Sequence, residues 1–290
     1  MPIADRQRPP PGELYLDHVS HFVGDLDKVG ALLEALGFAV TPVSAQVTQD
    51  GPAGTSNRCV MLAEGYLEFL APTANTPNAA RLRKSMRRYR GVHLVCFGTP
   101  AAEEEHARLA AHGFAPPPLV HLQRKVEDGM SARFSVVRAA PGKMPEGRVQ
   151  YVQHLVPEAI WRPAHLRHRN GVLGLAAAYV VAADPVRTAA RWARFMGALP
   201  RREGKFVALE TDRGKVLVGT RARMKALLGA APRSPGIAGY ALACRDPKAF
   251  ARQCRKAGLK LNRNLVVVLP PALGGAWRLV RSTTLSGSAG

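Results

Sequence analysis

The stretch that decides the fold runs from Leu14 to Gly37 and reads LYLDHVSHFVGDLDKVGALLEALG. An apolar segment comes first, Asp25 then provides a helix N-cap, and the following leucines recur at the spacing of one buried helix face. Gly37 is expected to end the helix, because glycine adopts the left-handed conformation without strain. The stretch therefore predicts a strand followed by an amphipathic helix.

The same pattern of strand, cap, helix and glycine occurs four times in the 290 residues. The caps Asp25, Thr99, Asp184 and Asp246 lie 12, 14, 13 and 12 residues before Gly37, Gly113, Gly197 and Gly258. Three extended runs follow each of the first two helices, so each of these units is a βαβββ module. Because a repeated supersecondary unit sets the architecture of a chain, we predict an α+β fold of four βαβββ modules in two paired domains.

The domain boundaries follow from these modules. We expect a flexible tail over 1–12, a paired domain over 13–160, a linker over 161–170, a second and degenerate paired domain over 171–281, and a flexible tail over 282–290. The chain is 47% hydrophobic and 21% charged, which is typical of a globular protein. No run approaches the roughly 18 apolar residues of a membrane span, and the N-terminus is polar and proline-rich, so we expect a cytoplasmic protein without membrane contact.

Charge and cysteines give weaker indications of function. From residue 171 onward the chain carries 21 Lys and Arg against 5 Asp and Glu, which is most of its net charge of +20. Such asymmetry can mark a nucleic-acid surface, but few aromatic residues accompany it, and we favour solvated basic residues. The four cysteines have no CxxC spacing and are interpreted as buried thiols.

Aligning the first two modules brings chemically capable residues to equivalent points. His18 aligns with His93 on the first strands, and Glu68 aligns with Gln153 on the last strands. Two imidazoles, a carboxylate and an amide oxygen are suitable ligands for a divalent transition metal with open positions for a substrate. His154 is the alternative to Gln153, because a shift of one residue turns the other face of a strand inward.

The same alignment brings Arg58 over Arg133 and Tyr66 over Tyr151. Arginines on neighbouring strands can hold an anionic group of a substrate through paired hydrogen bonds, although ordinary surface or ion-pair arginines are an equal alternative. These four residues are the expected substrate-binding residues.

The openings LDHV at 16–19 and GVHL at 91–94, with YLEFLAP at 66–72, resemble the glyoxalase-like domains of the vicinal oxygen chelate superfamily. The resemblance implies that each paired domain forms a cupped, incomplete barrel around one metal ion. It also implies that His18 and Glu68 are ligands.

The resemblance extends to His93, but other positions depart from the family pattern. Gln153 stands where a carboxylate is often found. Ala177 and Gly239 stand where the second pair of modules would carry histidines, so that pair is expected to lack a metal.

For the function, the resemblance implies a lyase or isomerase that depends on one divalent metal ion (Zn, Ni, Mn or Fe) and acts on a small carbonyl compound bound to the metal through oxygen. Glu68 would be a ligand and the catalytic base. The first alternative is an extradiol-type iron(II) ring-cleaving dioxygenase, since two histidines and a carboxylate also form its metal site. The second is a protein that sequesters a small molecule without catalysis. The partner is a small-molecule substrate, and the protein is expected to be a monomer or a homodimer.

Overall fold

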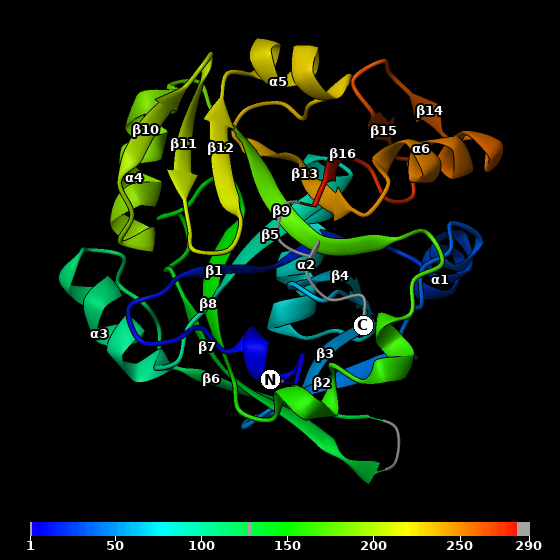
Figure 1. Cartoon of the computed structure of the whole chain (residues 1–290). Helices are drawn as coiled ribbons and strands as arrows, with labels where there is room; N and C mark the ends of the chain where they lie inside the picture. The colour runs from blue at the N-terminus through cyan, green and yellow to red at the C-terminus, as the bar shows by residue number, and fades with distance from the viewer. Residues whose placement is uncertain (1, 127–128, 283–290) are drawn as a thin grey trace.

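The computed structural model describes residues 2–126 and 129–282, and its elements follow the four modules in order (Figure 1). Module one contains β1 (Tyr15–Phe22), α1 (Leu26–Ala35), β2 (Ser44–Thr48), β3 (Gly51–Met61) and β4 (Tyr66–Pro72). Module two contains β5 (Gly91–Gly98), α3 (Ala102–Ala111), β6 (Val120–Lys125), β7 (Ser131–Arg138) and β8 (Arg148–His154). The connecting helix α2 (Pro77–Arg88) joins them.

The second half repeats this order with shorter strands. Module three contains β9 (Val172–Val181), α4 (Pro185–Met196), β10 (Pro200–Glu203), β11 (Phe206–Glu210) and β12 (Lys215–Gly219). Module four contains β13 (Gly236–Cys244), α6 (Pro247–Lys256), β14 (Lys260–Leu261), β15 (Val266–Val268) and β16 (Ala276–Arg281), with α5 (Arg221–Leu228) as the connection. The predicted α+β fold of four βαβββ modules is confirmed.

Three of the four predicted helix starts are confirmed. The side chains of Asp25, Asp184 and Asp246 each accept hydrogen bonds from two backbone amides at the start of a helix. The second module differs, because the N-cap of α3 is Ala101 and not Thr99. Thr99 lies two residues earlier, where its hydroxyl accepts a hydrogen bond from the amide of Ala101.

Modules one and two form a closed barrel with the strand order β1-β4-β3-β2-β6-β7-β8-β5. Modules three and four have the equivalent order, β10-β11-β12-β9-β13-β16-β15-β14, but form an open sheet of eight strands. The first sheet closes because β2 pairs with β6. The equivalent strands β10 and β14 are only 4 and 2 residues long and stand at opposite edges of the second sheet.

The second sheet lies against the barrel, at the top of Figure 1, and the two share one apolar core. Phe38 of module one packs edge-on against Phe250 of α6 and Trp277 of β16. His21 of β1 also crosses the boundary, with Nδ1 3.1 Å from the carbonyl oxygen of Leu273 and Nε2 3.0 Å from the hydroxyl of Tyr240. The two paired domains therefore fold against each other through a continuous interior.

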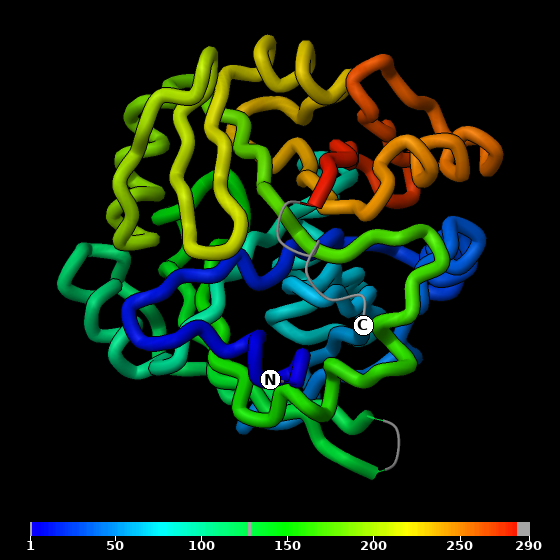
Figure 2. Tube along the Cα trace, viewed as in Figure 1, coloured from blue at the N-terminus to red at the C-terminus, as the bar shows by residue number. Residues whose placement is uncertain are grey.

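The N-terminal segment lies beside the chain that follows β8 (Figure 2). Residues 2–12, expected to form a tail, include a short 3-10 helix at Asp5–Gln7 and contact the barrel. The buried side chain of Gln7 donates a hydrogen bond to the carbonyl of Ala63, and Arg8 donates to those of His154 and Leu155. Residues 283–290 of the expected C-terminal tail lie outside the described residues.

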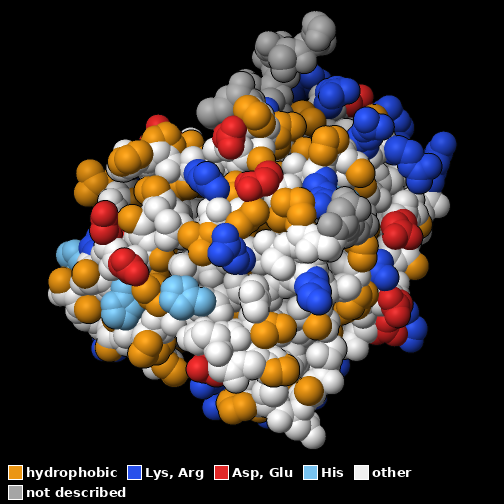
Figure 3. Space-filling view, turned by 90° about the horizontal axis from the view of Figure 1, so that it is seen from below, with side chains coloured by type: hydrophobic (Ala, Val, Ile, Leu, Met, Phe, Trp, Pro, Cys, Tyr) orange, Lys and Arg blue, Asp and Glu red, His pale blue; other side chains and the backbone are white. Residues whose placement is uncertain are grey.

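Surface charge and helix composition are relevant to binding of nucleic acid and of membranes. On the face in Figure 3, Lys and Arg side chains gather along one edge and elsewhere stand among apolar and acidic side chains. No helix within residues 2–126 and 129–282 combines the length and apolar character needed to cross a membrane.

Candidate functional site in the first barrel

The barrel of modules one and two encloses a cavity of about 390 Å³. Its polar lining comes from seven strands and the helix α2 and includes His18, Gln46, Asn57, Tyr66, Glu68, Asn78, Arg81, Arg124, Arg138, Arg148 and Gln150. Its apolar lining includes Leu70, Leu94, Val120, Leu122, Phe134, Val136 and Val152. The volume and this mixture of walls suit a small organic molecule with polar groups at one side.

Two rows of residues cross the cavity floor over the strands β4, β1, β5 and β8. The first row is Tyr66, His18, Cys96 and Gln150, and the second is Glu68, Ser20, Leu94 and Arg148. Paired residues on neighbouring strands are about one strand spacing apart, roughly 4.8 Å. Each row therefore brings side chains from four strands into one small region.

The pseudo-twofold relation between the modules differs from the one that the sequence alignment gave. A twofold rotation that exchanges β1 with β5 and β4 with β8 also exchanges the two rows. His18 is therefore equivalent to Leu94, and Glu68 to Gln150. His18 lies seven residues before the cap Asp25, and the residue seven before the cap Ala101 is Leu94. Taking Thr99 as the cap aligns His93 with His18 instead. Leu94 offers no metal donor, so the cavity holds one histidine where two were expected.

β-Bulges explain where His93 lies. The register of β1 and β5 shifts between Leu16 and His18 and again between Ser20 and His21, which leaves Asp17 and His93 as the extra residues. A bulge turns its extra side chain out of the regular alternation. His93 packs between the rings of Tyr89 and Phe22, at centroid distances of 4.1 and 5.2 Å.

The contacts of His93 are those of a structural residue. Its Nε2 lies 3.0 Å from the carbonyl oxygen of Tyr89, and burial lowers the pKa of the imidazole to about 4. His93 is not among the residues that line the cavity. The structure does not bring it together with His18 and Glu68.

Gln153 also points away from the cavity. Its Oε1 accepts a hydrogen bond from the amide of Ala102, and its Nε2 donates to the carbonyl of Pro100, so the side chain stabilises the start of α3. His154, the alternative on the same strand, is turned into the barrel and buried. Its Nε2 lies 2.9 Å from Oδ2 of Asp17.

Asp17 holds two imidazoles beneath the cavity floor. Its Oδ1 lies 2.6 Å from Nδ1 of His18, and its Oδ2 is paired with His154. Burial alone would raise the pKa of Asp17, but the attraction of His154 and hydrogen bonds from both rings hold it well below its usual range. Because the carboxylate accepts from Nδ1 of His18, the other nitrogen, Nε2, is the atom that can bind a metal or accept a proton, and it lies 3.5 Å from the hydroxyl of Tyr66.

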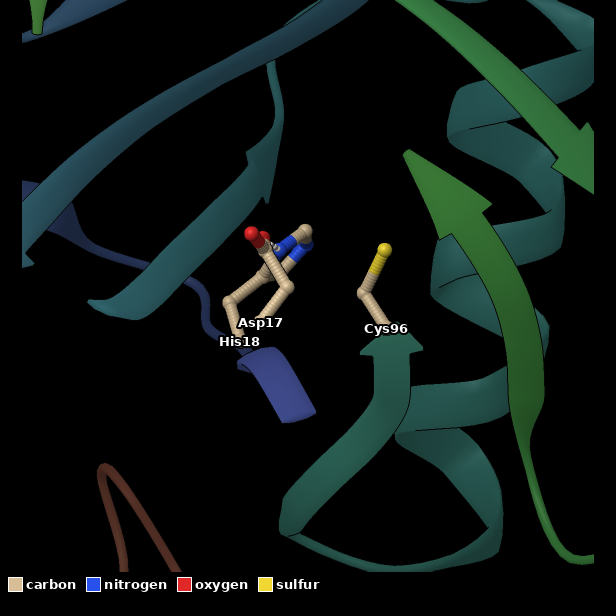
Figure 4. A group of neighbouring side chains, drawn as sticks. All are labelled: Asp17, His18 and Cys96. Carbon is tan, nitrogen blue, oxygen red and sulfur yellow. Dashed lines mark hydrogen bonds and ion pairs between the residues drawn. The ribbon is translucent and has the colours of Figure 1, made fainter. Parts of the chain in front are cut away.

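Asp17, His18 and Cys96 form a group that could hold a metal ion (Figure 4). Their ligand atoms all lie within 4.8 Å of one another, and within the described part of the chain no other three His, Cys, Asp or Glu side chains form such a group. Asp17 and Cys96 do not line the cavity. Burial raises the pKa of the Cys96 thiol well above its usual range, which favours the protonated form.

Three other donors line the cavity itself. Glu68 is buried, and its Oε1 accepts hydrogen bonds from Asn57 at 2.6 Å and Gln46 at 3.4 Å. Gln150 is also buried, and its Oε1 has no hydrogen-bond partner. A buried carbonyl oxygen without a partner is costly, and a cation is one partner that would satisfy it. His18, Glu68 and Gln150 therefore fit a metal ion.

The expected substrate-binding residues are divided by the barrel wall. Tyr66 lies inside, with its ring stacked on His18 at 4.2 Å. Arg58 lies outside and pairs with Asp27 of α1 at 2.9 Å. Arg133 is exposed on β7, and the hydroxyl of Tyr151 donates to the carbonyl of Phe195 in the shared core.

The arginines that face the cavity are ones the sequence analysis did not select. They are Arg81 in the first half of α2, Arg124 on β6, Arg138 on β7 and Arg148 on β8. Strand alternation puts Arg124 and Arg148 on the opposite strand face from their neighbours in the sequence. Alternation alone does not say which face is inside, so these arginines could be found only once the register of the strands was known.

The second sheet carries other residues at the positions equivalent to His18, Glu68, Leu94 and Gln150. The register of β9, β12, β13 and β16 puts Ala177, Leu217, Gly239 and Arg278 there. None of these side chains is a usual metal ligand, so the candidate site is confined to the first barrel.

The comparisons with known proteins agree with this fold. The sequence profile of the family described as "Glyoxalase-like domain" matches residues 16–196. The chain therefore belongs to the glyoxalase-like domain family, and the resemblance to the vicinal oxygen chelate superfamily is confirmed. A search of curated proteins finds no match.

Solved structures with the same fold have low sequence identity. A hypothetical protein from Staphylococcus aureus has a TM-score of 0.67 at 11% identity, covering 93% of this chain and 100% of its own. A mutant of 4-hydroxymandelate synthase from Streptomyces coelicolor has a TM-score of 0.58 at 14% identity, covering 92% of each chain. A xylose isomerase-like TIM barrel/4-hydroxyphenylpyruvate dioxygenase fusion protein has a TM-score of 0.55 at 12% identity, covering 87% of this chain and 40% of its own. At such identities the likeness is one of fold.

Proposed function

We propose that the first barrel binds one divalent metal ion through His18, Glu68 and Gln150 and acts as a lyase or isomerase on a small carbonyl compound. The observation that carries the proposal is the unpartnered Oε1 of buried Gln150, which lies in the same floor row as His18. Gln150 is also the pseudo-twofold equivalent of Glu68. A donor without a partner, beside an imidazole and a carboxylate, supports a cation site.

The residues of the barrel have distinct roles in this proposal. A bound divalent ion would polarise the carbonyl of a substrate held through its oxygens. Glu68 is the one carboxylate on the cavity floor, and it would accept the proton from the carbon next to that carbonyl. The amides of Asn57 and Gln46 both donate to its Oε1 and fix the orientation of the carboxyl group.

The rival metal site at Asp17, His18 and Cys96 is less favoured. Asp17 would have to give up hydrogen bonds to both imidazoles, and the Cys96 thiol would have to lose its proton. Neither residue faces the cavity, so a substrate there would not reach an ion bound to them. Both sites share His18, and only variants of the other ligands separate them.

The dioxygenase alternative has less support than the lyase or isomerase. A ring-cleaving iron(II) site of two histidines and one carboxylate needs a second imidazole in the cavity, where Leu94 stands. The activities in the names of the structural neighbours are properties of those proteins. A protein that only sequesters its ligand remains the competing function, and it predicts binding without turnover.

The first test is metal binding by the full chain. Elemental analysis of protein purified without a chelator or histidine tag, followed by a cobalt(II) titration, should give about one ion per chain. Gln150→Leu should weaken cobalt binding by at least about tenfold, since even outer-shell changes alter metal affinity by about 10- to 100-fold. The matched control is Gln153→Leu, an outward-facing glutamine on the same strand, which should leave it unchanged.

Cys96→Ser separates the two candidate sites. If the cobalt spectrum contains a thiolate band that disappears in Cys96→Ser, the ion lies at the rival site and our assignment fails. Proton abstraction is tested by NMR, as deuterium uptake next to the carbonyl in a panel of small ketones, aldehydes and 2-oxo acids. A compound that binds without exchange, and without difference between wild type and Glu68→Gln, would favour sequestration.

A further inference from the structure

We propose that the substrate of this barrel is a small carboxylic acid whose carboxylate is held by Arg138 and Arg148, with its carbonyl beside His18 and Gln150. The inference rests on the proposed function only in taking the cavity as the substrate site. The observation that carries it is a set of arginines that face one small cavity and have no carboxylate partner of their own.

The two arginines lie close together on the cavity wall. Arg138 stands opposite Gln150 on the paired strands β7 and β8, and Arg148 is two residues from Gln150 on the same strand face. Diagonal neighbours of this kind have Cα atoms about 7–8 Å apart, within reach of two long side chains. A single carboxylate can therefore contact both guanidinium groups.

Neither guanidinium forms an ion pair with a carboxylate among the described residues, although Glu68 attracts both from within the same cavity. Arg148 donates one hydrogen bond, from Nη2 to Oδ1 of Asn78 at 3.2 Å, and lies over the ring of Phe22 at 5.6 Å. Nε of Arg138 is buried without a partner. No ion pair of either arginine is found among the described residues, in contrast to the outward Arg58, which pairs with Asp27.

The charges around the cavity do not balance. Four arginines line it (Arg81, Arg124, Arg138 and Arg148) against the two carboxylates Glu68 and Asp50. Like charges crowded in a largely buried cavity are costly unless an anion is bound among them.

The position of the arginines indicates which part of the ligand is charged. Arg148 and Gln150 are two residues apart on one strand, about 6.6 Å, so the charged end of the ligand and the carbonyl beside Gln150 fall within the length of one small molecule. The guanidinium fork matches the two oxygens of a carboxylate. Further along the same strand as Arg138, Val136 and Phe134, with Leu122 on the paired strand β6, offer an apolar wall for the rest of the molecule.

The test compares an acid with its neutral ester. Calorimetry on the full chain, treated with chelator, would measure binding of 4-methyl-2-oxopentanoate and of its methyl ester. The acid should bind at least about tenfold more tightly than the ester, and Arg138→Gln and Arg148→Gln should each weaken binding of the acid by about tenfold or more, the change expected from losing one charge-assisted hydrogen bond.

Two outward arginines provide matched controls. Arg58→Gln and Arg133→Gln remove the same charge from the same barrel without touching the cavity, and should leave the affinity unchanged. Arg148→Lys keeps the charge but loses the fork, so it should fall between wild type and Arg148→Gln. Circular dichroism and a melting curve for each variant show whether it is folded before its affinity is interpreted.

Several outcomes overturn the inference. Among them are equal affinities for acid and ester, no binding of the acid at millimolar concentration, and an equal loss in the Arg58→Gln control. Tighter binding of inorganic phosphate than of the acid would replace the carboxylate with a phosphate. Because these measurements use chelator-treated protein, a failed cobalt titration would refute the metal proposal and leave this inference standing.

Discussion

His21 provides a sharp test of how the two paired domains are joined. The ring is fully buried between β1 and module four, and burial lowers its pKa to about 4. Because Nδ1 faces the carbonyl oxygen of Leu273, it must carry the proton, and Nε2 then accepts from the hydroxyl of Tyr240. Burial disfavours the charged form of the imidazole, so the folded protein holds the ring neutral.

The sign and size of the pH effect follow from linkage. In the unfolded chain a histidine titrates near pH 6.5, so below that pH the unfolded state binds a proton that folded His21 does not bind until about pH 4. Stability is therefore lost as the pH falls from 6.5 to 4. Between pH 7 and pH 5 the loss is about 2 kcal/mol for a histidine with this shift. His93, whose pKa is also lowered to about 4, adds a similar amount.

The assay is urea unfolding at pH 7, 6 and 5, followed by tryptophan fluorescence. A combined loss of at most about 4 kcal/mol is a large part of the 5–15 kcal/mol that stabilises an ordinary domain. His21→Gln can keep hydrogen bonds to both partners but does not titrate, so the fall in unfolding free energy between pH 7 and pH 5 should shrink by about 2 kcal/mol.

The control is His121→Gln, which alters an exposed histidine on β6 and should leave the pH dependence as in wild type. If His21→Gln retains the full pH dependence, then His21 is not held neutral at the domain boundary, and the reasoning from its burial is refuted.

Three further predictions concern the candidate site. His18→Ala should reduce cobalt affinity by at least about tenfold, whereas His93→Ala should leave the affinity unchanged and lower stability instead; equal effects in the titration would contradict the separation of the two rings. Gln153→Ala should lower the unfolding free energy by about 1 kcal/mol through the lost contacts at the start of α3, with the affinity for 4-methyl-2-oxopentanoate unaltered, as calorimetry would measure. Asp17→Ala should cost about 3–5 kcal/mol in urea unfolding, because it leaves two buried imidazoles without their partner; a loss below 1 kcal/mol would show that the pair of contacts is unimportant.

The fold could be predicted because its signals are local and occur more than once. Asp25, Asp184 and Asp246 each cap a helix in the way their sequence neighbourhood indicates, and glycine follows each helix. Because the pattern occurs four times, one misplaced helix cap does not obscure it. The sequence also identified His18, Tyr66 and Glu68, all of which line the cavity.

The second half of the site could not be predicted in the same way. A strand has a period of two, so one extra residue moves every later side chain to the other face. The bulges at Asp17 and His93 do this in both modules, and neither leaves a mark in the sequence. With Thr99 taken as the helix cap, the sequence aligns His93 with His18. In the structure the equivalent of His93 is the other bulged residue, Asp17.

The pseudo-twofold relation also predicts where a second histidine would join the candidate metal site. Leu94 occupies the position equivalent to His18, faces the cavity, and lies directly opposite Ser20 in the same row as Glu68. Leu94→His would therefore add a second imidazole to His18, Glu68 and Gln150, giving two histidines, a carboxylate and an amide oxygen around one cavity. An additional imidazole ligand should raise cobalt affinity by at least about tenfold, and the metal should still be lost on Glu68→Ala. The matched variant Leu70→His puts an imidazole elsewhere in the same cavity, two residues beyond Glu68 on β4, and should give a smaller gain. If Leu94→His binds cobalt no better than wild type while remaining folded, the two halves of the barrel do not meet around a common ion, and the assignment of Gln150 as a ligand fails with it.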